Sequence, residues 1–153
     1  MPASQVPRYP LLPSGRMNLF TYGTLMDPSI MAQVSGAEHR SRRSVLHDYV
    51  RKTVIGEVYP AIIRREGSSV EGTVYYDVSS ESFERLDRFE GSLYQRAEVP
   101  VICDDGESVA AETYVITESA VHQLSEEDWS YDRFLSKDRM LFLAAYPGYD
   151  ELA

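Results

Sequence analysis

Residues 70–91 read VEGTVYYDVSSESFERLDRFEG and change from strand to helix character within one stretch. Up to Val78 most residues are β-branched or aromatic, which is typical of a strand. From Ser79 onward the apolar residues follow a helical period, with Ser79 placed as N-cap and Val78 placed to pack against Phe83 across the cap. Gly91 is a typical helix stop. The stretch therefore predicts a strand followed directly by a helix.

Strand signals recur on both sides of this stretch. They are runs rich in β-branched and aromatic residues, separated by turn residues. Glu66-Gly67-Ser68 is predicted to form a hairpin loop between two of these runs, and residues 104–106 (Asp-Asp-Gly) a turn between two others. The predicted strands are residues 18–22, 45–55, 61–64, 70–78, 94–103 and 109–116.

Two further helical regions are predicted. Asp27 as N-cap and Pro28 in the first turn form a helix start, and Gly36 ends that helix. Near the C-terminus, Ser125 is predicted to cap a helical segment that continues through residues 140–146.

The order of these elements predicts an α+β fold. Strands outnumber helices, and most connections between strands are too short for regular βαβ crossovers. We expect a mixed or antiparallel sheet that curls into a small β-barrel with flanking helices. Residues 1–17 form a proline-rich lead-in, and residues 18–153 are predicted to be a single domain.

Composition narrows the classes of function. The 153 residues carry a formal net charge of −9, which disfavours binding to nucleic acid. The single cysteine, Cys103, excludes an internal disulfide and fits a reducing compartment. Residues 1–17 lack the apolar core of a signal peptide, and no apolar run reaches the roughly 20 residues of a membrane span. We therefore expect a cytoplasmic protein with neither nucleic acid nor membrane as partner.

One acidic residue of the predicted helix lies on its apolar face. With Phe83 at 0° and a step of about 100° per residue, Leu86 lies near 300° and Glu90 near 340°. A carboxylate in that position needs a partner or takes a raised pKa. A raised pKa near neutrality suits a catalytic acid/base. Alternatively, Glu90 accepts hydrogen bonds from neighbouring N–H groups or pairs with Arg96.

A second candidate feature is the turn after the first strand, Tyr22-Gly23-Thr24-Leu25. Gly23 permits a positive φ or the close approach of another backbone. The N–H groups that follow it can form a small nest for a carboxylate or an oxyanion. The alternative is an ordinary strand-to-helix turn. No lysine follows the glycine in the pattern of a nucleotide-binding loop.

The two features resemble the gamma-glutamylcyclotransferase-like family, which includes gamma-glutamylamine cyclotransferases and plant avirulence-induced-gene proteins. Residues 19–26 (LFTYGTLM) resemble its opening signature, and 59–62 (YPAI) and 70–75 (VEGTVY) resemble its next strands. Residues 86–91 (LDRFEG), with Tyr94 and Arg96 after them, resemble the segment of the family that carries the catalytic glutamate. The resemblance covers about residues 18–116.

The resemblance implies an α+β fold around a small barrel and a gamma-glutamyl substrate held by residues 22–25, largely through main-chain groups. It implies that Glu90 is the catalytic acid/base and that 5-oxoproline and a free amine are the products. Thr24-Leu25 resembles the gamma-glutamylamine branch. Tyr94 is a candidate for the pocket wall or for a hydrogen bond to Glu90, or else a half-buried strand tyrosine. No cofactor or metal is expected, because the three histidines are scattered. The alternative function is a non-catalytic module that binds or senses a small molecule.

Overall fold

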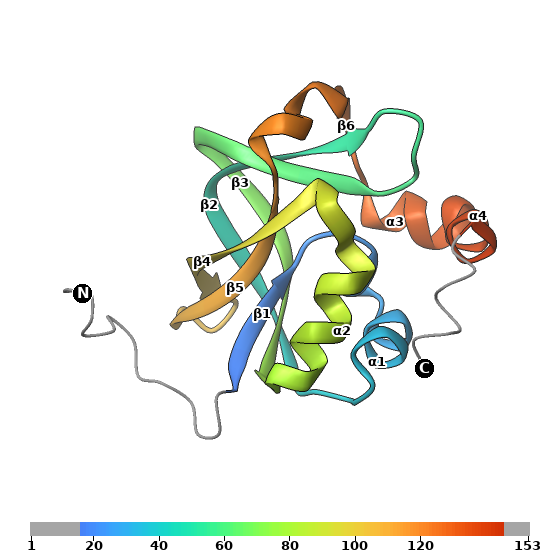
Figure 1. Ribbon diagram of the computed structural model, residues 1–153. Coiled ribbons are helices and arrows are strands. Elements are labelled where there is room, and N and C mark those ends of the chain that lie inside the picture. Colours follow the sequence, from blue (N-terminus) through green and yellow to red (C-terminus); the bar gives the residue numbers. More distant parts are fainter. Residues whose placement is uncertain (1–15, 146–153) are drawn as a thin grey trace.

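The computed structural model describes residues 16–145. Most of the predicted lead-in, and the predicted helix end near Tyr146, lie outside these residues. Helices α1 and α2 lie side by side on one flank of a curled sheet, and α3 and α4 lie beyond them (Figure 1). Two hydrogen bonds from α2 side chains reach carbonyl groups of α1. The Ser82 hydroxyl donates to the Ser35 carbonyl at 2.8 Å, and Arg85 Nε donates to the Val34 carbonyl at 2.9 Å.

Five of the strands close into a barrel, which confirms the predicted fold class. The strand order is β3-β1-β5-β4-β2, and a further pairing of β2 with β3 completes the circle. Strand β1 pairs in parallel with β5, at Leu19 and Glu112, and the other pairings are antiparallel, so the sheet is mixed. The strands are β1 (Met17–Thr21), β2 (Ser41–Val54), β3 (Pro60–Val78), β4 (Tyr94–Cys103), β5 (Ser108–Ile116) and β6 (Leu124–Asp128).

The predicted hairpin loop at residues 66–68 is wrong. These residues lie within the single long strand β3, and β2 pairs with β3 on both sides of them, at Tyr49 with Arg64 and at His47 with Ser69. The extra residues form a bulge opposite Asp48, whose carboxylate accepts a hydrogen bond from the Gly67 N–H at 3.0 Å. A glycine-serine pair marks a bulge as readily as a turn, so the local signal could not separate the two.

The first two helices follow their predicted limits. Helix α1 (Pro28–Ser35) has Asp27 as N-cap and Gly36 in the left-handed conformation at its end. Helix α2 (Ser80–Glu90) has Ser79 as N-cap and is followed by Gly91. The remaining helical elements are short, namely the 3-10 helices Thr24–Met26, Gly91–Leu93 and Glu118–Gln123, α3 (Tyr131–Arg133), the π-helical turn Phe134–Asp138, and α4 (Arg139–Ala145).

The predicted cap at Ser125 is also wrong. Ser125 lies in β6, where its hydroxyl donates to the Thr53 carbonyl at 2.6 Å. The helical segment begins later, with Ser130 as the N-cap of α3. Residues 124–128, which precede α3, pair with β2 in the sheet, so a tertiary contact overrides the local helix signal at Ser125.

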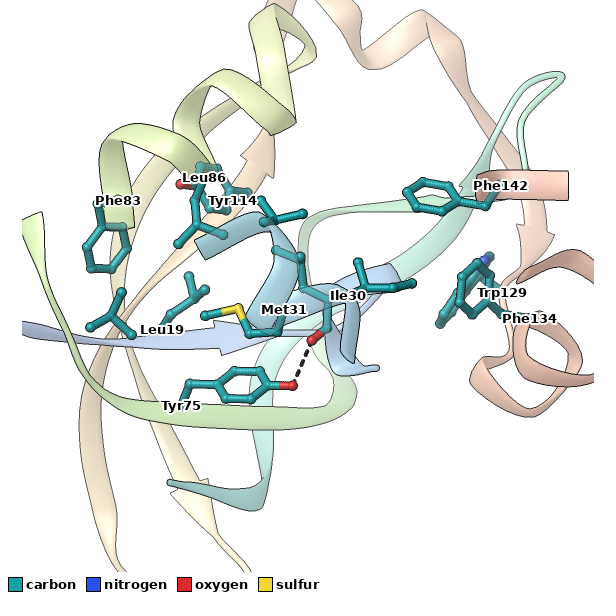
Figure 2. Packing of buried hydrophobic residues seen from close by; sticks show 13 residues of the cluster. Leu19, Ile30, Met31, Tyr75, Phe83, Leu86, Tyr114, Trp129, Phe134 and Phe142 are labelled. Carbon is teal, nitrogen blue, oxygen red and sulfur yellow. Dashed lines mark hydrogen bonds between the residues drawn. The ribbon is translucent and has the colours of Figure 1, made fainter. Parts of the chain in front are cut away.

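Two apolar clusters meet along β1. Phe20 and Tyr22 belong to the cluster inside the barrel, whereas Leu19 belongs to the cluster between the barrel and the helices. This alternation follows from the two-residue period of a strand. Figure 2 shows the outer cluster, with Leu19, Tyr75 and Leu86 on one side and Phe134 and Phe142 on the other. The end of β1 therefore emerges between the two cores.

Candidate active site

Strand β1 delivers the turn at residues 22–25 to the rim of the barrel. Gly23 has a φ of −133°, so the turn does not need a positive φ there. It needs space, because a Cβ on Gly23 would lie 2.9 Å from both Cδ and Cγ of Pro60. Of the two reasons for a glycine at this position, close approach to Pro60 is therefore the one that applies.

Three main-chain donors of the turn have no partner within the part of the chain that the structure describes. The Gly23 carbonyl accepts from the Met26 N–H at 3.0 Å, and the Thr24 carbonyl accepts from the Asp27 N–H at 3.1 Å. The N–H groups of Gly23, Thr24 and Leu25 have no acceptor among residues 16–145. Three successive donors at the start of a 3-10 helix can hold an anion or an oxyanion.

Glu90 is the last residue of α2, and it lines the same pocket as the turn. Its carboxylate has no hydrogen-bond or ion-pair partner among the described residues. Burial, with a smaller contribution from the negative charge of Asp87, raises the pKa of Glu90 to about 8. The side chain keeps partial access to solvent through the mouth of the pocket. A carboxyl group with this pKa exchanges its proton readily near neutral pH.

Arg96 does not neutralise Glu90. Its Nε lies 3.0 Å from Asp87 and its Nη1 lies 3.3 Å from Glu112, and its guanidinium stacks over the ring of Phe83. Asp87 also accepts a hydrogen bond from the Tyr114 hydroxyl at 2.6 Å. The positive charge of Arg96 is therefore engaged by two other carboxylates, Asp87 one turn of helix before Glu90 and Glu112 on β5.

The pocket brings the sequence-predicted site residues together. Tyr22, Gly23, Thr24, Leu25, Glu90 and Tyr94 all line it. The Tyr94 hydroxyl donates to the Pro60 carbonyl at 2.7 Å, which holds its ring in the wall. Further lining residues, which sequence reasoning did not single out, are Phe20, Thr21, Tyr59, Pro60, Phe89, Leu93, Tyr114 and Phe142.

The pocket suits a small polar ligand. Its volume of about 80 Å³ is room for roughly five to eight atoms the size of a water oxygen. Among residues 16–145, Glu90 is the only charged side chain that lines it, so a carboxylate inside would have to rest on hydroxyl and main-chain donors. Aromatic rings dominate the rest of the wall, which lowers the local dielectric and strengthens such contacts.

Residues 16–145 contain neither a candidate metal cluster nor a membrane-spanning helix. No group of three or more His, Cys, Asp or Glu side chains comes together there in a way that could hold a metal ion. No helix in this part of the chain has the length and apolar character required to cross a bilayer.

The turn at residues 22–25 and the Glu90 carboxyl group, which has no partner among the described residues, thus meet at one pocket at the rim of the barrel. A family model described as gamma-glutamyl cyclotransferase, AIG2-like, matches residues 19–131. The chain belongs to this family, and the resemblance noted from the sequence is confirmed.

The relatives support the same placement. The chain is 34% identical to protein AIG2 C of Arabidopsis thaliana over 64% of its length and 60% of that protein's length. It is 27% identical to AIG2-like protein A of the same plant over 84% of this chain and 78% of that one. The matched part thus spans about three fifths of the first relative.

Solved structures share the fold. The solution structure of an Arabidopsis thaliana protein superposes with a TM-score of 0.67 at 27% identity, covering 85% of this chain and 79% of that one. A structure named gamma-glutamyl cyclotransferase gives a TM-score of 0.58 at 18% identity over 66% of each chain, a likeness of fold alone.

Proposed function

We propose that the protein cyclises a gamma-glutamyl amine or peptide, releasing 5-oxoproline and a free amine, with Glu90 as general acid/base. The observation that carries this proposal is that Glu90 and residues 23–25 line one pocket, where the Glu90 carboxyl group and the N–H groups of residues 23–25 have no hydrogen-bond partner among the described residues. Membership of the gamma-glutamyl cyclotransferase, AIG2-like family supports it.

Such a substrate contains its own nucleophile. The α-amine and the γ-carbonyl carbon belong to one molecule, and their bond closes a five-membered ring. The protein therefore has to hold the reactive conformer and move protons, and it needs no covalent intermediate.

Proton transfer begins at Glu90. The carboxylate accepts a proton from the α-ammonium group, and the resulting amine attacks the γ-carbonyl carbon. The oxygen of the tetrahedral intermediate becomes negatively charged and is stabilised by the N–H groups of the turn. Protonated Glu90 then donates to the leaving nitrogen, and the bond between this nitrogen and the γ-carbon breaks. The ring nitrogen gives up its second proton, so both protons lost by the α-ammonium group end on the departing ammonium ion.

The turn also has a role in binding. The substrate's α-carboxylate needs donors, and the described pocket wall contains no Lys, Arg or His side chain. The three free N–H groups of residues 23–25 are the donors suited to it, or to the oxyanion.

The test is a panel of gamma-glutamyl amines and dipeptides, incubated with the protein and assayed for 5-oxoproline. Glu90→Gln should reduce turnover of a confirmed substrate by about 10²–10⁴-fold, the usual contribution of general acid–base catalysis. Glu84→Gln, an exposed change on the same helix, is the matched control and should leave turnover unchanged. Binding of the panel by the wild-type protein without any 5-oxoproline would instead favour the non-catalytic module.

A further inference from the structure

In residues 22–26, which are the turn and the residue that follows it, hydrogen bonds are distributed unevenly between the carbonyl and the N–H groups. All five of its carbonyl groups accept a hydrogen bond from the protein. Two of these bonds come from main-chain N–H groups, that of Met26 to the Gly23 carbonyl and that of Asp27 to the Thr24 carbonyl. The other three come from two side chains on the neighbouring strands β2 and β3, Arg51 and Tyr75. The N–H groups of Gly23, Thr24 and Leu25 receive no acceptor among the described residues.

Arg51 fixes the first peptide of the turn. Its Nη1 donates to the Tyr22 carbonyl at 2.8 Å and to the Glu71 carbonyl at 3.0 Å, so it ties the turn to β3. Its guanidinium stacks over the Trp129 ring, with 5.3 Å between Cζ and the ring centroid. In a trans peptide the C=O and N–H bonds point in opposite directions. Since the Tyr22 carbonyl points toward Arg51, which does not line the pocket, the Gly23 N–H points the opposite way.

Tyr75 fixes the other end of the turn. Its side chain is buried between the barrel and the helices, and its hydroxyl donates to the Leu25 carbonyl at 2.8 Å and to the Met26 carbonyl at 3.3 Å. Figure 2 shows the first of these bonds as a dashed line from the Tyr75 hydroxyl. Neither of the two carbonyls that Tyr75 holds is available to turn toward a ligand.

We propose that Arg51 and Tyr75 are positioning residues that set the polarity of the turn, so that it presents donors and no acceptors to a carboxylate or oxyanion. Loss of the Arg51 contact frees the peptide between Tyr22 and Gly23 to rotate and to place its carbonyl oxygen opposite the anion, where the two repel each other. Loss of the Tyr75 contact leaves the Leu25 and Met26 carbonyls without that donor and loosens the end of the turn, which then keeps only its own main-chain bonds. The proposal rests on the proposed function only for the identity of that anion.

Binding of 5-oxoproline tests the proposal without reference to turnover. The probe pair is 5-oxoproline and pyrrolidin-2-one, which has the same ring without the carboxylate. Arg51→Met should weaken 5-oxoproline binding about tenfold or more, the loss expected for one hydrogen-bonded anion contact, and leave pyrrolidin-2-one binding within about twofold. Arg64→Met is the matched control, because Arg64 also stacks on an aromatic ring, that of Tyr49, but makes no bond to the turn.

Two further measurements separate positioning from general destabilisation. Tyr75→Phe keeps the buried ring and removes only the hydroxyl, so it should reproduce the selective loss in a folded protein. Arg51→Ala should recover 5-oxoproline binding when methylguanidinium is added, because the free ion can occupy the space of the lost side chain. With a confirmed substrate, we expect these variants to raise KM more than they lower kcat.

Several results would overturn the proposal. It fails if the wild-type protein does not bind 5-oxoproline. It also fails if the variants lose 5-oxoproline and pyrrolidin-2-one binding equally, or if they bind both ligands as the wild type does. A wild-type protein that binds 5-oxoproline selectively but forms none from any gamma-glutamyl compound would refute the proposed function and leave this inference standing.

Discussion

Replacement of Glu90 by glutamine should change how the stability of the protein depends on pH. The pKa of Glu90 rises from its usual value of 4.5 to about 8 in the folded chain, mainly because the carboxyl group is buried. Between these two values the unfolded chain has released the proton while the folded chain still holds it. The folded wild-type protein therefore loses stability as pH rises through this window. Glu90→Gln has no proton to release, so this loss should disappear.

The magnitude follows from the two pKa values. Each pH unit between them changes the free energy of unfolding by about 1.4 kcal/mol, so the full effect at pH 7 is about 3 kcal/mol. Solvent at the mouth of the pocket reduces the effect. We therefore expect the free energy of unfolding of Glu90→Gln, relative to that of wild type, to rise by about 1–3 kcal/mol as the pH goes from 4.5 to 7.

Urea unfolding provides the measurement. Trp129 is the only tryptophan in the chain and is 7% exposed, so its fluorescence should report the loss of packing. Unfolding would be followed at pH 4.5, 6, 7 and 8.5, with far-UV circular dichroism as a second probe. Glu84→Gln, on the exposed face of the same helix, should run parallel to wild type. If Glu90→Gln also runs parallel to wild type, the carboxyl group is well hydrated and the reasoning about its pKa fails.

Three other predictions concern the pocket. Asp87→Asn removes the negative charge that helps to raise the pKa of Glu90; the acidic limb of the kcat/KM profile, which follows loss of the Glu90 proton, should therefore move to lower pH. Gly23→Ala places a Cβ 2.9 Å from the Pro60 ring, and thermal or urea unfolding should show a destabilisation of about 1–3 kcal/mol together with a raised KM. A short leaving amine with a charged tail should give a lower kcat/KM than its neutral analogue of equal length, because Glu90 is the only charged side chain that the described residues bring to the pocket wall; equal rates would contradict this.

Local sequence was informative where a short-range rule decides the outcome. The caps at Asp27 and Ser79 and the stops at Gly36 and Gly91 are contacts within a few residues, and the structure confirms all four. The helical period likewise placed Glu90 on the apolar side of α2, because the angle between two residues of one helix is set by their separation.

Local sequence misled where one signal fits two structures. The glycine at position 67 permits a turn or a bulge, and only the pairing of β2 with both halves of β3 selects the bulge. Ser125 could cap a helix, but β2 recruits its segment into the sheet. Arg96 follows Glu90 closely in sequence, yet its charge goes to Asp87 and to Glu112 on the adjacent strand β5.

By itself, the sequence determined the limits of α1 and α2, the positions of β1, β4 and β5 along the chain, the family, and the two segments that carry the candidate chemistry. The tertiary structure alone decided that those segments share one pocket, that Glu90 has no partner there among the described residues, and that Arg51 and Tyr75 hold the carbonyls of the turn. The physical reason is distance along the chain. Caps and helical faces depend on neighbours a few residues away, whereas the surroundings of a carboxyl group or a peptide depend on strands that only closure of the barrel brings together.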